Sequence, residues 1–455
     1  MKKEYHVLRI LVILFSVIFF MVLFFMDGVL VSNDTLSYVE FTYGREPLYP
    51  LFLALFRFLF GENRYFTAVV LVQCLLAAFS VYRLTDVIDQ KFHLDRLSFW
   101  LIPFFQYAVV LLCRFAASRR ATYCNEICSE GLAIPLFALF MAEVFQYVWY
   151  QKKGNLIALT ALGSSLILVR KQMYIVIAIL LVIGVSMLIM KRIRLKKFLW
   201  CLLAIAGTIF LSIEVDLLYN FCLRGEAMRH TTDASAMVVT TLYCSQPEDS
   251  VYFEDQKISR LFLDIMEEVE EKQYNYKYAQ GNWLSRYTHY ADHYDLIGYT
   301  IVNPNFYEYL GTHYTLSDNE REQAFDELNQ IMLSTLLPVN FVKICKVTFI
   351  NMMTGVCNTI SKASSWLTWY NILFVILYLI FMIRSMVRKK NPDLAWFSFI
   401  ILVGTAINVG AVGFMIFAQT RYMVYNMPLV YMALYLLMRD FAREKWQSRL
   451  QNVGE

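Results

Sequence analysis

The chain has 455 residues, of which 58% are hydrophobic and 17% charged, and its formal net charge is +4 at pH 7. Soluble domains are about half apolar and about a quarter charged, so this composition argues against a soluble protein. The small net charge and the absence of a long basic run exclude nucleic acid as an expected partner. The nine cysteines show no metal-binding spacing. These features indicate an integral membrane protein.

The apolar residues come in long blocks, beginning with residues 8–26 (LRILVILFSVIFFMVLFFM). A helix needs roughly 20 such residues to cross a bilayer core of about 30 Å. The first block follows a short basic start and lacks a small-residue cleavage site, so we interpret it as a retained first helix. The chain is predicted to have about ten spans, at residues 8–27, 66–83, 97–113, 130–149, 156–169, 172–190, 197–219, 367–384, 394–417 and 423–438.

Lysine and arginine in short loops favour the cytoplasmic side of a membrane. One orientation places six basic segments on that side: MKKEYHVLR, DQKFHLDR, YQKKGN, KRIRLKK, RSMVRKK and RDFAREKWQSR. We therefore expect a multi-pass protein of the cell (cytoplasmic) membrane with both termini in the cytoplasm. Residues 28–65, the turns near Arg170 and Arg421, and the long stretch 220–366 would then lie outside.

The long outer stretch is acidic, with 19 Asp or Glu against 8 Lys or Arg over residues 221–340. Its many aromatic residues predict a folded domain rather than a disordered loop. Ser317 and Glu320 have the spacing of a capping box that opens a helix, and Pro338 is expected to stop it. The apolar residues 339–362, interrupted by Lys343 and Lys346, are predicted to form an interfacial helix.

The predicted organisation therefore has three parts. Residues 1–220 form an N-terminal transmembrane module whose first outer loop, 28–65, carries the active site. Residues 221–338 form an extracytoplasmic domain. Residues 339–455 contain the interfacial helix and the C-terminal transmembrane helices.

The first outer loop reads DGVLVSNDTLSYVEFTYGREPLYPLFLALFRFLFG. Asp34 lies just past the first span, and Tyr38 follows one helical turn later on the same face. Pro47 suits a helix start, and the apolar segment 48–60 is too short to span, so it is expected to lie in the interface. An alternative role for Asp34 is a helix N-cap in a solvated loop.

This loop resembles that of membrane glycosyltransferases that use polyprenyl-phosphate sugar donors, the GT-C superfamily, and most of all bacterial family-39-like and aminoarabinose-transferase-like enzymes. The resemblance rests on Asp34, Tyr38, Gly44, Arg45, Pro47, Leu48, Tyr49, Pro50, Leu53 and Gly61. It extends to Ser129-Glu130, to residues 317–338, and to Arg421-Tyr422 followed by Pro428. Residues 225–315 match no pattern that we recognise.

The resemblance implies an all-α polytopic membrane fold: a GT-C-like bundle of about ten transmembrane helices, with interfacial helices in the first outer loop and an inserted extracytoplasmic domain. It also implies that Asp34 is the general base, because a carboxylate within reach of an acceptor hydroxyl can take its proton. Asp27 and Glu46 are rival carboxylates: Asp27 as an interface anchor, Glu46 as a partner of Arg45. Glu130 is either a second acid or a residue favoured by a helix N-terminus.

A polyprenyl-phosphate leaving group needs fixed cations, and arginine suits phosphate oxygens. The resemblance and the outward placement nominate a set of substrate- and donor-phosphate-binding residues: Tyr38, Arg45, Glu46, Arg170, Lys171, Arg421 and Tyr422. The outward arginines Arg114, Arg119 and Arg120 have the same placement. The alternative is that these cations bind lipid headgroups or pair with outer carboxylates.

The expected function is transfer of a hexosyl or pentosyl group, with inversion, from a polyprenyl-phosphate donor to a glycan, lipid or protein acceptor outside the membrane. Membrane lipid and this donor are the expected partners; no cofactor beyond the donor is indicated, and a divalent metal is left open. One alternative is a polysaccharide polymerase or ligase acting on lipid-linked oligosaccharides. Another is a lipid or glycan transporter, which would favour repeated halves, and we find no repeat.

Overall fold

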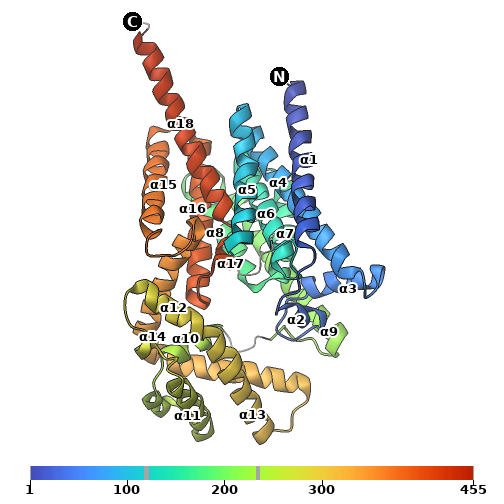
Figure 1. Ribbon diagram of the computed structural model, residues 1–455, viewed down its shortest axis with the longest axis vertical. Coiled ribbons are helices and arrows are strands. Elements are labelled where there is room, and N and C mark those ends of the chain that lie inside the picture. The colour runs from blue at the N-terminus through green and yellow to red at the C-terminus, as the bar shows by residue number, and fades with distance from the viewer. Residues whose placement is uncertain (1, 117–121, 232–235, 454–455) are drawn as a thin grey trace. The chain divides into compact units, whose positions relative to one another are not determined.

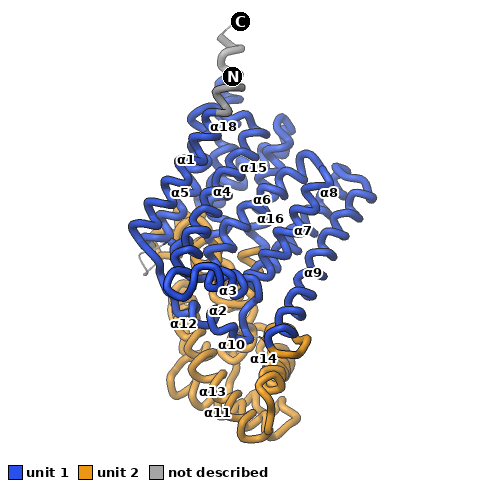
Figure 2. The backbone as a smooth tube through the Cα atoms, turned by 90° about the vertical axis from the view of Figure 1, so that its right-hand side faces the viewer, with its two compact units in different colours: residues 1–223, 373–407, 424–455 blue, residues 224–372, 408–423 orange. Residues whose placement is uncertain are grey.

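The computed structural model describes residues 2–116, 122–231 and 236–453, which fold into helices joined by loops. The one strand-like feature of these residues is an isolated parallel bridge between Leu30 and Glu126. The predicted all-helical fold is thus confirmed for the described part of the chain. Two compact units are present (Figure 2): unit 1 comprises residues 1–223, 373–407 and 424–455, and unit 2 comprises residues 224–372 and 408–423.

Unit 1 is a bundle of long helices in which α1 packs on α4, α4 on α6, and α6 on α7 (Figure 1). It contains all or most of α1 (Lys2–Asp27), α2 (Thr35–Val39), α3 (Leu48–Phe60), α4 (Tyr65–Phe92), α5 (Arg96–Ala116), α6 (Glu130–Tyr150), α7 (Lys153–Val169), η1 (Lys171–Tyr174), α8 (Ile175–Ile189), α9 (Leu195–Arg224), α15 (Thr368–Arg388), α16 (Pro392–Met415) and α18 (Met427–Val453).

Nine helices among the described residues are long and apolar enough to cross a membrane. Eight of them match predicted spans, and the ninth is α14 (Asp318–Ile360) of unit 2. The predicted fifth span is the shorter helix α7, with 17 residues. The predicted last span lies mainly in the first half of α18, whose later residues are charged. The chain is therefore a multi-pass membrane protein.

All six basic segments lie at one end of unit 1, where side chains connect them. Lys91 and Arg192 both pair with Asp393, at 2.6 and 3.5 Å. The same end contains further contacts: Arg9–Asp86, Lys197–Gln151, Arg384–Glu444 and Arg439–Asp95. Both termini also lie at this end, whereas α2 and α3 lie at the other (Figure 1). The expected common side of the basic loops agrees with these contacts; the assignment of that side to the cytoplasm stays a prediction.

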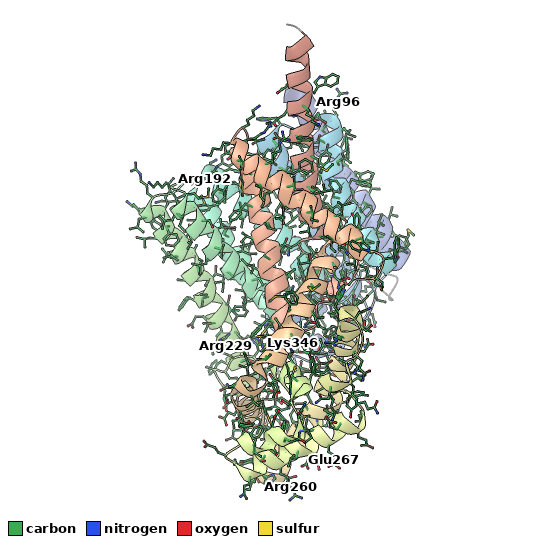
Figure 3. The ribbon with its side chains drawn as sticks, turned by 90° about the vertical axis from the view of Figure 1, so that its left-hand side faces the viewer. Arg96, Arg192, Arg229, Arg260, Glu267 and Lys346 are labelled. Carbon is green, nitrogen blue, oxygen red and sulfur yellow. The ribbon has the colours of Figure 1, made fainter. Side chains whose placement is uncertain are left out.

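Unit 2 is a separate helical unit with its own core. Its elements are α10 (Ala236–Cys244), η2 (Pro247–Tyr252), α11 (Gln256–Glu271), η3 (Tyr276–Tyr278), α12 (Trp283–Asp295), η4 (Leu296–Val302), α13 (Asn303–His313), α14 (Asp318–Ile360) and α17 (Thr420–Met423). Phe262, Phe306 and Phe325 lie at the centre of that core, fully or almost fully buried. Figure 3 shows Arg260 and Glu267 on α11, whose charged side chains point away from the core.

The prediction that Pro338 ends a helix is wrong. The capping box of Ser317 and Glu320 does open the helix, but α14 continues through Pro338 for 43 residues. An interior proline removes one backbone hydrogen bond and strains the preceding turn. Packing on both sides offsets this cost, because Leu336 and Ile344 belong to the same buried core. The helix thus continues past residue 338, where a domain boundary is predicted, and unit 2 extends to residue 372.

The polar residues that interrupt 339–362 have a packing role. Asn351 Nδ2 donates to the Gly413 carbonyl at 3.3 Å, and Asn358 Nδ2 donates to the Ala418 carbonyl at 2.6 Å. The asparagines thus satisfy backbone groups of the segment 408–423 inside unit 2. The expected separate interfacial helix is instead continuous with the rest of α14, which as a whole contains a stretch long and apolar enough to span a membrane.

Candidate active site

The first outer loop is held against the segment that precedes α6. Leu30 N donates to the Asn125 carbonyl, and Ile127 N donates to the Leu30 carbonyl, both at 2.9 Å. Thr35 Oγ1, at the first residue of α2, donates to the Ile127 carbonyl at 2.8 Å. These bonds satisfy backbone groups of both segments, and the loop and the start of α6 together form a hydrogen-bonded platform.

Gln73, a fully buried side chain of α4, joins three parts of this platform. Its Nε2 donates to the carbonyls of Cys124 (2.9 Å) and Glu126 (3.0 Å). Its Oε1 accepts from the Tyr49 hydroxyl of α3 at 2.9 Å. Gly131 permits this packing, since a Cβ atom there would lie 2.4 Å from the Gln73 amide. The sequence signal for this role is a lone glutamine within an otherwise apolar span.

Asp34 is paired with Arg45 rather than used as a helix cap. It occupies the N-cap position of α2, yet its side chain makes no capping hydrogen bond. Its Oδ1 instead accepts from Arg45 Nη2 at 2.8 Å, and the two side chains are 28% and 27% exposed. Arg45 Nε also donates to Ser37 Oγ at 2.8 Å. The alternative of a simple cap is therefore wrong, and the carboxylate is oriented at an accessible position.

Tyr38 continues this arrangement into the protein. The Arg45 guanidinium lies 4.5 Å from the Tyr38 ring centroid, and its Nη1 donates to the Tyr38 hydroxyl at 3.3 Å. The hydroxyl in turn donates to Ser129 Oγ at 3.1 Å. Burial raises the pKa of Tyr38 well above its ordinary value, despite the opposing effect of Arg45. Tyr38 is therefore a neutral hydrogen-bond donor here.

Ser129 connects Tyr38 to a buried ion pair. Arg170 Nη1 donates to Ser129 Oγ at 3.0 Å and lies 2.7 Å from Glu130 Oε1. The Glu130 side chain has no exposed surface, and that of Arg170 is 12% exposed. The six residues Asp34, Arg45, Tyr38, Ser129, Glu130 and Arg170, here called the polar chain, thus form a continuous series of contacts from an accessible carboxylate to a buried cation.

The rival residues are placed differently. Asp27 accepts two hydrogen bonds from Arg114, from Nε at 2.9 Å and from Nη2 at 2.7 Å. The carboxylate and the guanidinium therefore form a bidentate ion pair. Glu46 is 8% exposed, and the ion pair of Arg45 is with Asp34 and not with Glu46. The paired-carboxylate alternative thus describes Arg114, and Arg45 and Arg170 are paired with acids as well. Of the three candidate carboxylates Asp27, Asp34 and Glu46, Asp34 is the most exposed.

The other residues predicted for the site lie outside the six-residue polar chain. Lys171 opens η1 directly after Arg170 and is exposed. Arg421 and Tyr422 lie in α17 of unit 2. Arg119 and Arg120 lie outside the described residues. Within the described ranges, no three His, Cys, Asp or Glu side chains are grouped as a metal site would require.

A small cavity of about 70 Å³ lies within unit 1. Its walls are mainly apolar, and Phe20, Val81 and Val109 contribute to them from α1, α4 and α5. Thr122 and Cys124, from the loop that Gln73 holds, also line it. Its apolar lining is suited to hydrocarbon rather than to a polar group.

Comparison with known proteins gives little additional information. No protein-family model and no curated protein sequence matches the chain. Among solved structures, the chain is similar to the archaeal oligosaccharyltransferase AglB from Archaeoglobus fulgidus, solved in complex with an inhibitory peptide and a dolichol-phosphate. The identity is 13% and the TM-score 0.47, over 99% of this chain and 52% of that one. The chain thus spans about half the length of the solved chain that it matches.

Proposed function

We propose that this protein is a membrane glycosyltransferase of the GT-C type, which moves a sugar from a polyprenyl-phosphate donor to a hydroxyl acceptor outside the cytoplasm. The polar chain supports this proposal. It joins an accessible carboxylate and two guanidinium groups through direct contacts. A base and fixed cations are what displacement of a phosphate from an anomeric carbon requires.

Asp34 is the proposed general base. As the acceptor oxygen forms its bond to the anomeric carbon, the hydroxyl proton passes to the Asp34 carboxylate, and the bond from that carbon to the phosphate oxygen breaks. The 2.8 Å contact with Arg45 orients the carboxylate, as a third group orients the base in other catalytic arrangements. A single displacement of this kind inverts the anomeric configuration.

The leaving polyprenyl phosphate carries negative charge and needs cations beside it. Lys171 is exposed and is the proposed direct contact. Arg170 lies next to it in sequence and is held by Glu130, so its proposed role is to fix the position of η1 and to add positive potential. The apolar cavity of unit 1 is suited to part of the hydrocarbon tail.

The decisive experiment is Asp34→Asn assayed in membranes for sugar transfer from radiolabelled polyprenyl-phosphate hexose and pentose donors. We expect loss of transfer with donor binding retained. Glu62→Gln is the matched control, because Glu62 is a 63% exposed carboxylate paired with Arg57 near the end of the same loop. Full transfer by a correctly inserted Asp34→Asn protein would refute the role of Asp34.

A further inference from the structure

At the end of unit 1 where the basic segments lie, three cations share one carboxylate. Glu444 of α18 pairs with Arg384 and Arg388 of α15 at 2.7 and 3.0 Å, and Lys390 lies 3.7 Å from its other oxygen. One negative charge balances one of the three cations, so this group carries two uncompensated positive charges. An excess of one sign at a protein surface indicates a partner of the opposite sign.

The two helices that carry this group are held side by side by aromatic contacts (Figure 1). Phe374 packs on Tyr431, and Phe381 packs on Phe441, with ring centroids 5.0 and 5.4 Å apart. The Arg384 guanidinium lies 4.1 Å from the centroid of the Phe441 ring. Arg384 therefore has both a ring and a carboxylate to hold it, which leaves the other two cations available for a ligand.

Those two cations hold their charges at the surface. The side chains of Arg388 and Lys390 are 51% and 67% exposed, whereas that of Glu444 is 14% exposed. The other acid of this crevice, Asp440, adds one negative charge, and the exposed Lys389 adds one positive charge. The crevice itself has about 10 Å³ of free space, room for about one water molecule. A ligand therefore lies across the exposed cations and not inside a cavity.

An apolar stripe of α15 leads directly to these cations. Ile376, Ile380, Ile383 and Val387 are exposed, and their spacing of four, three and four residues places them on one face of the helix. α15 is long and apolar enough to cross a membrane, so hydrocarbon chains cover this face. Arg388 follows Val387 in the sequence. A phospholipid with its acyl chains on the stripe thus has its headgroup beside the cations.

We propose that Arg388 and Lys390 bind the headgroup of an anionic phospholipid. Arginine suits phosphate oxygens, and basic sites between membrane helices attract anionic headgroups. Arg384 stays with Glu444 and keeps that carboxylate from repelling the lipid phosphate. The apolar stripe assigns the anion to a membrane lipid, because a soluble phosphate makes no use of it. The proposal concerns unit 1 alone and holds whether or not the chain transfers sugars.

The test is lipid binding to the full-length protein in micelles of uncharged detergent, measured by native mass spectrometry. Dioleoyl phosphatidylglycerol and dioleoyl phosphatidylcholine have the same tails and differ in headgroup charge. We expect wild type to bind phosphatidylglycerol about 30-fold more tightly, the effect of two uncompensated cations beside an anionic headgroup. Arg388→Gln/Lys390→Gln should abolish this preference and leave binding of phosphatidylcholine unchanged, because Arg384 still pairs with Glu444. Lys390→Gln alone should lower the preference about 5-fold.

Arg194→Gln/Lys196→Gln is the matched control and should keep the preference. It removes an arginine and a lysine, two residues apart and both exposed, from another basic segment at the same end of unit 1. Equal loss in the two double variants, a preference kept by both the Arg388/Lys390 and the Lys390 variants, or no preference in wild type would each overturn the proposal. Excess glycerol 3-phosphate should not displace phosphatidylglycerol; displacement would show that phosphate alone suffices and would overturn the assignment to a membrane lipid.

Discussion

The Glu130–Arg170 and Asp34–Arg45 ion pairs should respond very differently to loss of their acids. Their contact distances are nearly equal, 2.7 and 2.8 Å, so distance does not discriminate between them. Burial does: the Glu130 side chain has no exposed surface, whereas that of Asp34 is 28% exposed. Breaking a buried pair costs about 3–5 kcal/mol because a charge remains uncompensated, but an exposed pair contributes about 0–1 kcal/mol.

Glu130→Gln should therefore lower the free energy of unfolding by about 3 kcal/mol, and Asp34→Asn by less than about 1 kcal/mol. Thermal unfolding in detergent, followed by intrinsic fluorescence, compares the two variants under one condition. The double variant Glu130→Gln/Arg170→Gln should be more stable than Glu130→Gln alone, because both charges are then gone. Equal midpoints for the two single variants, or a double variant less stable than Glu130→Gln, would refute this reasoning.

Three other predictions concern single side chains. Gln73→Leu removes the Gln73 donor from the buried Cys124 carbonyl and the Gln73 acceptor from the buried Tyr49 hydroxyl, and should cost about 2–4 kcal/mol, which thermal unfolding can check; a midpoint unchanged from wild type would contradict it. Asp27→Asn should destabilise the protein by leaving Arg114 unpaired but should retain sugar transfer, unlike Asp34→Asn; equal loss of transfer in both would restore Asp27 as a candidate base. Burial lowers the pKa of the His289 imidazole below its ordinary value of 6.5, so the folded protein favours the neutral ring. The stabilisation that the neutral ring contributes is complete above pH 6.5 and is lost as the pH falls through the lowered pKa. His289→Gln should therefore lose less stability than wild type as the pH falls. Unfolding midpoints of the variant that match those of wild type throughout pH 5 to 7 would contradict this role of His289.

The sequence predicted local features of the site better than its contacts. Asp34, Tyr38 and Arg45 lie within one short loop, so the sequence predicts them as a group, and the structure brings them together. Glu130 and Arg170 were each nominated alone. Their pairing joins residues forty positions apart, on α6 and just after α7, and no local pattern carries that information.

Errors arose where tertiary packing overrode local preference. Pro338 is an unfavourable residue inside a helix, but the buried neighbours on both sides keep α14 continuous. Asn351 and Asn358 lie within the segment 339–362, which the sequence predicts to be an interfacial helix. Their partners are backbone carbonyls of residues 408–423, a segment far away in sequence, so the sequence alone could not distinguish internal packing from a membrane surface.

The continuity of α14 limits how the protein can be divided for study. At 1.5 Å per residue, its 43 residues form a rod about 65 Å long. A truncated fragment that stopped at Pro338 would cut this rod in the middle and remove Ile344 and Val347 from the core of unit 2. It would also retain Asp249 without Asn340, whose Nδ2 donates to it at 2.8 Å. Soluble expression of residues 221–338 would therefore yield an incomplete domain, and any fragment that keeps this core must also keep a membrane-length apolar helix.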